Sequence, residues 1–414
     1  MKKPILTFIV AIMCSISLFN TDISGERLVA VSIDINSKYA IVYNLNDNRI
    51  MYTKSAEDKM YPASLTKMMT ALVAIDKIKD LDGLVTVSAA SLQGLSASGA
   101  SVAGFKENER VTYRDLLYGL LLPSGADAAN QLGLSLYSSN EKMVKAMNAK
   151  AKQLKLGETH FTNLTGLHDD NHYSSASDLL TILQRVIKNK DLKQIISTNR
   201  YTTSDGALTF THTLLHHEAL TAADTSYIKG GKTGFTYEAG QCLASYAEKN
   251  GETYLSILGN AAVENNSAAL INDATTLYSH FFDDFTRVTL FTKGKVITKA
   301  NVSKAHQSQV GLVAKQDLSA LLPNNYDKKL LKVRFHNQEA LEAPLDKHQY
   351  LGEVSVRYDS GLVATCSVYA SKQIDKTLIS NAIDIVKGNW AYIILLILVS
   401  IYSVRLYKRY NRIA

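Results

Sequence analysis

A serine followed three residues later by a lysine occurs three times in this sequence, and such a pair can perform nucleophilic chemistry. The pairs are Ser64/Lys67, Ser139/Lys142 and Ser226/Lys229. Residues three apart share one face of a helix, so the lysine amine can reach the serine hydroxyl. Burial lowers the pKa of a lysine, and the neutral amine can then take the proton of a serine nucleophile.

Local context separates the three pairs. Ser64 opens an apolar helical pattern that continues to residue 75, which predicts a buried helix. Ser139 lies in a polar run before another helical segment, where we expect a helix cap. Ser226 precedes a strand, in which residues three apart point to opposite faces. Ser64 and Lys67 are therefore the candidate nucleophile and base.

Two further motifs could complete such a site. One is Ser124 in Leu122-Pro123-Ser124-Gly125-Ala126-Asp127, and the other is Lys232-Thr233-Gly234. A cation beside a hydroxyl suits a carboxylate, and Gly234 lets a substrate backbone approach closely. Taken singly, each motif also has a structural interpretation, Ser124 as a helix cap and Lys232 as a lysine at a sheet edge.

A histidine cluster invites a metal interpretation that the spacing does not favour. His212 and His216 lie four residues apart, and Glu218 follows His217. The His-Glu-x-x-His order of a zinc helix is absent, so solvated or structural histidines are favoured.

The elements around these motifs predict an α/β domain over residues 25–285, with an antiparallel sheet flanked by helices. Short strands are predicted at 28–33, 39–43 and 49–53, with the last two forming a hairpin, and at 241–247 and 253–259. Helices are predicted from Ser64 to residue 75 and at 113–137, 141–155 and 267–282. Alternating short strands and turns then predict a small β domain over 286–370, followed by an amphipathic helix over 371–389.

The two ends of the chain have the composition of targeting and membrane segments. Lys2 and Lys3 precede an apolar run to residue 19, which predicts a signal peptide over 1–24; an uncleaved anchor is the alternative. Residues 390–407 predict a transmembrane helix, with a cytoplasmic basic tail at 408–414. A buried core helix is the alternative there. A single C-terminal span would place the other domains on the extracellular side of the cell membrane.

Charge and cysteine content exclude some classes of protein. The signal segment carries a net charge of +1 and the last four cations +4, so the body of the chain keeps +2 of the total +7. That balance does not indicate a nucleic-acid partner. Outside the signal segment only Cys242 and Cys366 occur, in different predicted domains, where we expect buried thiols without a disulfide.

The motifs together resemble those of the penicillin-binding proteins and serine β-lactamases. Their flanking segments resemble the low-molecular-mass D-alanyl-D-alanine carboxypeptidases over roughly residues 28–282, and more loosely through the β domain. The segments that carry this resemblance are Tyr61 to Thr70, Asn163 to Leu167, His172 to Asp178, and Gly231 to Gly240.

The resemblance implies a β-lactamase/transpeptidase-like fold and a mechanism without metal or cofactor. Ser64 would attack the carbonyl between the two terminal D-alanines of a peptidoglycan stem peptide while Lys67 takes its proton. The N–H groups of Ser64 and Phe235 would form the oxyanion hole. Lys232 and Thr233 would bind the terminal carboxylate beside Gly234, and Ser124 would relay the proton to the leaving amine. β-Lactams would acylate Ser64 as inhibitors.

Three other functions remain open at the level of sequence. A transpeptidase uses the same acyl-enzyme with an amine as acceptor. A β-lactamase also shares it, but the Glu-x-x-Leu-Asn signature of class A enzymes is not found here. A surface scaffold that binds stem peptides without turnover is the non-enzyme alternative.

One departure from the family pattern generates a prediction. The second motif is usually Ser-x-Asn, whereas this chain has Ala126 in the third position. Ala126→Asn should leave the release of D-alanine from a pentapeptide unchanged or higher, because the amide adds a donor for the substrate carbonyl. A large loss of kcat/KM would show that this motif is misaligned.

Overall fold

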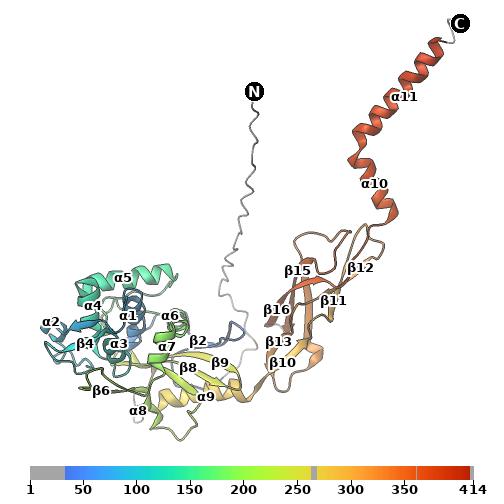
Figure 1. The fold of residues 1–414 in the computed structure, drawn as a ribbon. Helices are drawn as coiled ribbons and strands as arrows, with labels where there is room; N and C mark the ends of the chain where they lie inside the picture. Colours follow the sequence, from blue (N-terminus) through green and yellow to red (C-terminus); the bar gives the residue numbers. More distant parts are fainter. Residues whose placement is uncertain (1–32, 263–267, 360, 411–414) are drawn as a thin grey trace, which may run out of the picture.

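The computed structural model describes residues 33–262, 268–359 and 361–410. The predicted signal peptide over 1–24 lies outside this part, as does most of the strand predicted at 28–33. An N-terminal domain, a β domain and two C-terminal helices follow one another along an elongated molecule (Figure 1).

A five-stranded antiparallel sheet forms the centre of the N-terminal domain, in the order β2-β1-β9-β8-β7. The predicted hairpin is confirmed, because β1 pairs with β2 directly. The strand β7 lies at one edge, so its outer side pairs with no further strand of this sheet and faces η1 (Ala63–Leu65) instead. The bounds are β1 Tyr39–Asn44, β2 Arg49–Lys54, β7 Ile228–Thr236, β8 Gly240–Lys249 and β9 Glu252–Ala261.

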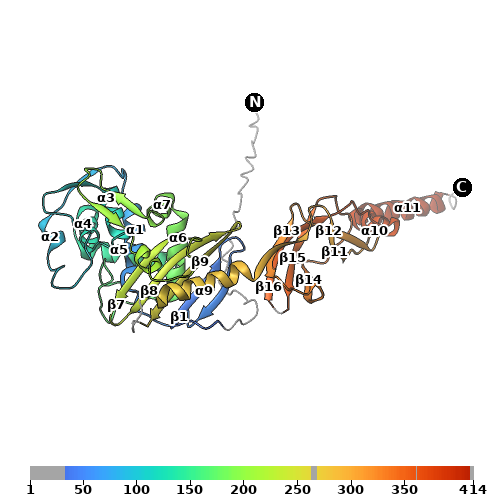
Figure 2. The ribbon, with the colours of Figure 1, turned by 90° about the horizontal axis from the view of Figure 1, so that it is seen from below.

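Helices cover both faces of this sheet. The helix α9 lies along one face (Figure 2), where α8 contacts it, and α6 packs on the other face with α1, α3, α4, α5 and α7 on that side. Apolar side chains of the sheet accordingly divide between two buried clusters. The elements are η1 Ala63–Leu65, α1 Thr66–Ile75, β3 Leu84–Thr86, α2 Ala89–Leu92, β4 Arg110–Thr112, α3 Tyr113–Leu121, α4 Ala126–Tyr137, α5 Asn140–Gln153, α6 Ala176–Lys188, α7 Lys190–Ile196, β5 Arg200–Thr202, β6 Thr209–Thr211, α8 Leu214–Glu218 and α9 Ala269–Asp283.

The single helix predicted over 113–137 is wrong, because the chain breaks between α3 and α4. Ser124 has a left-handed backbone with φ +67°, which no helix interior accommodates. The Gly125 N–H donates to the Gly119 carbonyl at 2.9 Å. A Cβ at Gly125 would lie 2.7 Å from that oxygen, so a glycine is needed for this sharp turn.

The C-terminal β domain consists of a two-stranded sheet, β10-β13, and a five-stranded sheet, β11-β12-β16-β15-β14. Its elements are β10 Phe285–Phe291, β11 Val296–Asn301, β12 Gln309–Val313, β13 Leu318–Pro323, η2 Lys328–Leu330, β14 Leu331–His336, β15 Tyr350–Tyr358 and β16 Gly361–Ala370. Ile374 and Lys376 form further bridges to this domain. The helix expected from residue 371 therefore begins only at Leu378.

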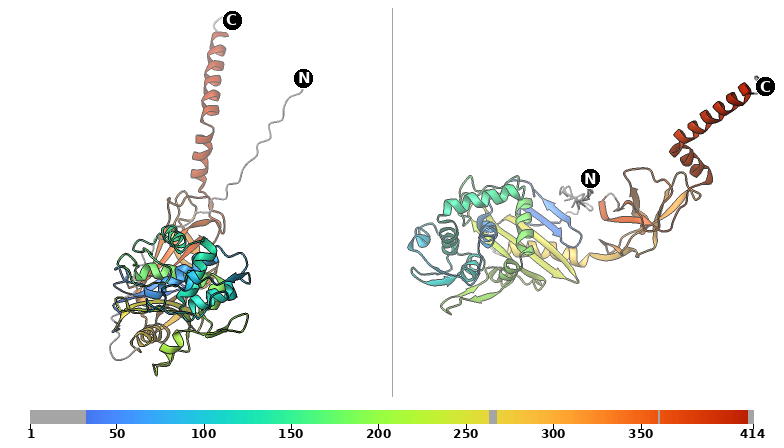
Figure 3. Two further views of the ribbon diagram at one scale, coloured as in Figure 1. Left: turned by 90° about the vertical axis from the view of Figure 1, so that its left-hand side faces the viewer. Right: turned by 45° about the horizontal axis from the view of Figure 1, so that its top comes forward.

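Two helices follow, α10 Leu378–Gly388 and α11 Trp390–Tyr410. The segment Trp390–Arg409 is long and apolar enough to cross a membrane, and none of its most apolar stretch is buried. Figure 3 shows α11 extending away from both domains, which argues against the core-helix alternative.

Hydrogen bonds and ion pairs join the two domains. Arg287 of β10 pairs with Glu252 at 2.5 Å and with Asp47 at 2.7 Å. Arg49 donates to the carbonyl oxygen of Leu321, at 3.3 Å. These partly buried pairs cross between the domains and hold the start of the β domain against the end of the central sheet.

Both cysteines of the described chain are free. Cys242 is buried in β8, as expected. Cys366 in β16 is only half-buried, which corrects the expectation of two buried thiols.

Candidate active site

The structure brings Ser64 and Lys67 together at the start of the first long helix. Ser64 lies in η1, one turn before Lys67 in α1, and the lysine Nζ donates to the Ser64 Oγ at 3.0 Å. Ala63 has φ +45°, an uncommon backbone conformation for a residue with a side chain. The chain thus turns sharply into the helix at the serine.

Lys67 is almost completely inaccessible, with 2% of its surface exposed. Burial lowers the pKa of its amine to about 7, although the negative charge of Asp127 opposes the shift. A substantial fraction of the amine is therefore neutral near pH 7, and its lone pair can accept the serine proton. The carbonyl oxygen of Thr165 accepts a second hydrogen bond from Nζ, at 2.6 Å.

The loop that supplies this carbonyl is built around Asn163. Its Oδ1 accepts from the N–H and hydroxyl of Thr165, both at 3.1 Å, and from the Gly166 N–H at 2.7 Å. Its Nδ2 donates to the Leu167 carbonyl at 2.9 Å. One side chain therefore fixes the whole turn, and through Thr165 it fixes the position of Lys67.

The same loop packs directly against the backbone of Ala63 and Ser64. Gly166 has φ +80°, and a Cβ there would lie 1.8 Å from the Ala63 carbonyl oxygen. Only a glycine permits this approach.

The buried side chain of His172 stabilises the start of α1 through Thr66. Thr66 Oγ1 lies 2.7 Å from His172 Nε2, and the Thr162 N–H donates to Nδ1 at 3.1 Å. Since Nδ1 accepts, Nε2 carries the proton and donates to Thr66. Burial lowers the pKa of His172 to about 4, so the ring is neutral at physiological pH.

The third motif lies on the edge strand β7, beside the serine. A Cβ at Gly234 would be 3.0 Å from the Ser64 nitrogen, which shows how closely β7 approaches η1. Thr233 is 7% exposed, and its hydroxyl lies 2.6 Å from that of Thr213. Lys232 is fully buried, so it is not an ordinary edge lysine.

The ammonium group of Lys232 has few hydrogen-bond acceptors around it within the described part of the chain. Its Nζ donates to the Thr233 carbonyl at 2.7 Å. Burial, and the charge of Lys67 nearby, lower the pKa of Lys232 well below its ordinary value. An anion bound here would restore the charged form.

His212 supports the same strand and is structural. Its Nδ1 accepts from the Leu214 N–H at 3.0 Å, so Nε2 donates to the Gly231 carbonyl at 3.1 Å. Burial lowers the pKa of His212 to about 4. Both nitrogens are occupied by backbone groups, which leaves neither for a metal ion.

Ser124 is buried, and its hydroxyl finds no hydrogen-bond partner within the described part of the chain. It is thus not joined to Ser64 or Lys67 by a direct hydrogen bond. A buried donor without a partner is unfavourable, which is consistent with a group that awaits a ligand. Ala126 is buried at the start of α4, and its N–H donates to the Ser101 carbonyl at 2.8 Å.

Phe235, whose N–H is the second expected oxyanion donor, ends the buried part of the motif. Its ring is 46% exposed and packs edge-on against Tyr237 at a centroid distance of 5.6 Å. The two rings mark the downstream end of β7.

Several supporting residues were not predicted from the residues alone, among them Asn163, Thr165, His172, His212 and Thr213. The only local signal was the Asn-x-Thr-Gly order of residues 163–166, which is typical of a turn stabilised by an asparagine side chain. The others act through contacts between distant parts of the chain.

A sheet with helices on both faces, and a serine hydrogen-bonded to a buried lysine near its edge strand, are typical of serine acyl-transfer enzymes. The family model for D-alanyl-D-alanine carboxypeptidases, peptidase S11, matches residues 26–262, and the chain belongs to this family. The model for the C-terminal domain of penicillin-binding protein 5 matches residues 285–376. The chain is accordingly a serine-type hydrolase. A stem-peptide substrate and the binding of β-lactams fit this family.

Individual relatives agree with this assignment. The D-alanyl-D-alanine carboxypeptidase DacF of Bacillus subtilis is 26% identical over 94% of this chain and 99% of its own length. The structure of penicillin-binding protein 5 from Haemophilus influenzae covers 84% of this chain and 100% of its own, with 25% identity and a TM-score of 0.65. A mutant of the DD-transpeptidase of Streptomyces K15 covers 61% of this chain and 99% of its own, with 29% identity and a TM-score of 0.55.

The Asn163 loop generates a prediction. Asn163→Ala should slow acylation by a penicillin about tenfold to a hundredfold, because the Thr165 carbonyl would no longer hold Lys67 in line with Ser64. Stopped-flow measurement of labelling with a fluorescent penicillin gives this rate.

Asn148→Ala is the matched control. Asn148 also fixes a backbone segment through its side chain, since it donates to the Phe161 carbonyl at 2.8 Å and accepts from the Phe161 N–H at 2.9 Å, two residues before Asn163. Acylation of this variant should remain close to wild type. Equal losses in both variants would mean that Asn163 serves stability alone.

Proposed function

We propose that Ser64 is the nucleophile and Lys67 the general base of a D-alanyl-D-alanine carboxypeptidase that trims peptidoglycan stem pentapeptides. The observation that carries this proposal is the 3.0 Å hydrogen bond between Lys67 Nζ and Ser64 Oγ, made by a fully buried lysine whose pKa is lowered to about 7. Geometry and proton affinity both suit the transfer of the serine proton.

In the first step Ser64 Oγ forms a bond to the carbonyl carbon of the penultimate D-alanine, and its proton moves to Lys67. The negative charge on the carbonyl oxygen is stabilised by the N–H groups of Ser64 and Phe235. The amide C–N bond then breaks, and the proton on Lys67 passes through the hydroxyl of Ser124, which has no partner in the described chain, to the leaving amine of the terminal D-alanine. An ester between the peptide and Ser64 results.

Lys232 and Thr233 bind the terminal carboxylate of the substrate, with Gly234 leaving room for its backbone. The buried carboxylate favours the protonated form of Lys232. The resulting positive charge in turn disfavours a proton on Lys67, because the two amines influence each other. Substrate binding thereby prepares Lys67 as the base.

Hydrolysis of the ester by water releases the shortened peptide and regenerates Ser64. Capture of the same ester by an amine would make the enzyme a transpeptidase, and the Streptomyces K15 relative carries that name. A weak β-lactamase activity would also use this ester. We favour water as the acceptor, because the family and the full-length relatives are carboxypeptidases.

The enzyme acts at the outer face of the cell membrane in this proposal. Residues 1–24 direct export, α11 spans the bilayer once, and the basic end of the chain stays in the cytoplasm. The β domain lies between the N-terminal domain and α10, so we propose that it holds the active site away from the bilayer (Figure 1).

Labelling and turnover test this proposal together. A fluorescent penicillin should label the wild type covalently and leave Ser64→Ala unlabelled, since the ester requires the Ser64 hydroxyl. The wild type should also release D-alanine from a stem pentapeptide, whereas Ser64→Ala should release none above background.

Ser139→Ala is the matched control, because Ser139 also precedes a lysine by three residues but caps α5 through its bond to the Lys142 N–H. It should keep full labelling and release. Labelling of Ser64→Ala would refute the nucleophile. Absence of labelling and of D-alanine release in the wild type would favour the scaffold.

A further inference from the structure

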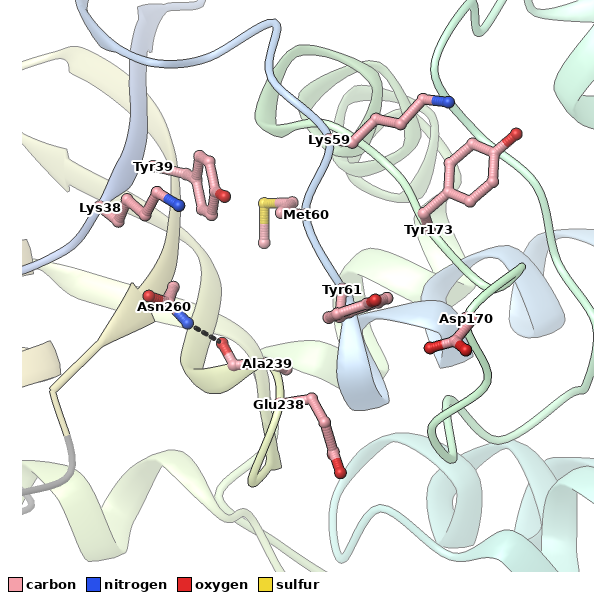
Figure 4. A pocket seen from close by; sticks show the side chains of 10 residues that line it. All are labelled: Lys38, Tyr39, Lys59, Met60, Tyr61, Asp170, Tyr173, Glu238, Ala239 and Asn260. Atoms are coloured by element: carbon pink, nitrogen blue, oxygen red, sulfur yellow. Dashed lines mark hydrogen bonds between the residues drawn. The ribbon is translucent and has the colours of Figure 1, made fainter.

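Two places outside the three motifs bring polar side chains close to the proposed active site. The first is a cavity beside the turn between β7 and β8 (Figure 4). Several of its polar groups have partners without a ligand, since Asn260 donates to the Ala239 carbonyl at 3.1 Å, and His168 lies 3.5 Å from an Asp170 oxygen and 3.9 Å from a Glu238 oxygen. The second place is Thr213, whose partner belongs to the carboxylate site itself.

The segment before α8 connects the turn at Ser124 with the strand β7. The Thr213 N–H donates to the Leu122 carbonyl at 3.1 Å, two residues before Ser124. The preceding residue, His212, donates from Nε2 to the Gly231 carbonyl of β7 at 3.1 Å. These bonds place Thr213 between the second and third motifs without the use of its side chain.

The hydroxyl of Thr213 is therefore available for another purpose. Thr213 immediately precedes α8, but its side chain makes no capping hydrogen bond to that helix. Within the described part of the chain, its single hydrogen bond is to the Thr233 hydroxyl, at 2.6 Å, and the Thr233 side chain likewise makes only this one. Two hydroxyls joined by one hydrogen bond use one of their two protons, so the other remains for a ligand.

The chemistry of the ligand decides which hydroxyl keeps its proton. In the proposed function Thr233 binds the terminal carboxylate, and a carboxylate can only accept hydrogen bonds. The Thr233 proton must then point to the ligand, so the bond between the two threonines is donated by Thr213. In such a chain each hydrogen bond polarises the next, which strengthens the bond to the charged acceptor.

We propose that Thr213 is a positioning residue for the carboxylate site. Its hydroxyl donates to Thr233 and thereby directs the Thr233 proton toward the terminal carboxylate of the peptide, while Thr213 itself does not touch the substrate. This inference rests on the proposed function, which assigns the carboxylate to Lys232 and Thr233. It adds a residue that lies outside all three motifs.

Thr213→Val tests the hydroxyl alone, because valine keeps the branched shape and the backbone N–H that binds Leu122. The KM for D-alanine release from a stem pentapeptide should rise about tenfold with kcat nearly unchanged, since the carboxylate is bound equally before and during the reaction. Thr213→Ser retains a hydroxyl and should recover most of this loss.

Thr209→Val is the matched control. The Thr209 hydroxyl lies 3.0 Å from that of Thr202, in an exposed threonine pair on the hairpin of β5 and β6. This variant loses the same kind of hydrogen bond away from the site, so its KM should equal that of the wild type.

A double-mutant cycle with Thr233→Val separates positioning from a purely structural role. Because Thr213 acts through Thr233, adding Thr213→Val to Thr233→Val should cause little further rise in KM. Additive losses in the double variant would overturn the inference, as would a failure of Thr213→Ser to recover activity.

Equilibrium binding to Ser64→Ala distinguishes the inference from the proposed function, since it requires no turnover. Adding Thr213→Val should weaken the binding of a pentapeptide with a free terminal carboxylate about tenfold, and that of the same peptide ending in an amide much less. Equal losses for the two peptides would overturn the inference. Failure of the proposed function would instead appear as absent D-alanine release by the wild type.

Discussion

The structure depends on the burial of two lysines, Lys67 and Lys232, close enough for the charge of one to affect the other. Neither forms an ion pair within the described part of the chain, and each donates to a backbone carbonyl. Removing an ammonium group from water is costly unless it is paired, and the usual response is a lowered pKa. The site therefore cannot easily hold two protons, and this is what makes Lys67 available as a base. A bound carboxylate relieves the same constraint at Lys232.

The surrounding fold supplies the rigidity that this arrangement requires. Ala63 and Ser124 both adopt positive φ values beside the site, and such residues cost about 1–3 kcal/mol each. The cost is sustained because the turns are fixed from several directions. Gly166 packs on Ala63, the Asn163 side chain holds the loop, and the sheet register fixes β7 against η1. Strained backbone at these two positions therefore flanks the site.

Much of the site could be predicted from sequence because its motifs are local. The segment after Ser64 has a helical apolar pattern, so Lys67 could be placed beside Ser64. The segment after Ser226 has a strand pattern, so the pair Ser226/Lys229 could be dismissed. The break at Ser124 was missed, because an apolar helical pattern runs through it and the left-handed turn depends on Gly119, Gly125 and Asp127 packing together. The contact between Lys67 and the Thr165 carbonyl joins residues 98 positions apart, which no local pattern encodes. The late start of α10 has the same cause, since Ile374 pairs with Leu345 in the β domain.

The protonation state of Lys67 tests the account most directly. Lysine side chains labelled with ¹³C and ¹⁵N can be titrated by NMR in the intact enzyme, with Lys67→Arg to assign the signal. The Lys67 amine should titrate with a pKa of about 7 in the free enzyme, because it is buried. Addition of D-alanine, which carries the terminal carboxylate, should lower that value by returning a proton to Lys232. A Lys67 pKa near the ordinary lysine value of about 10.4 would contradict the account, because the amine would then be charged when it has to accept a proton.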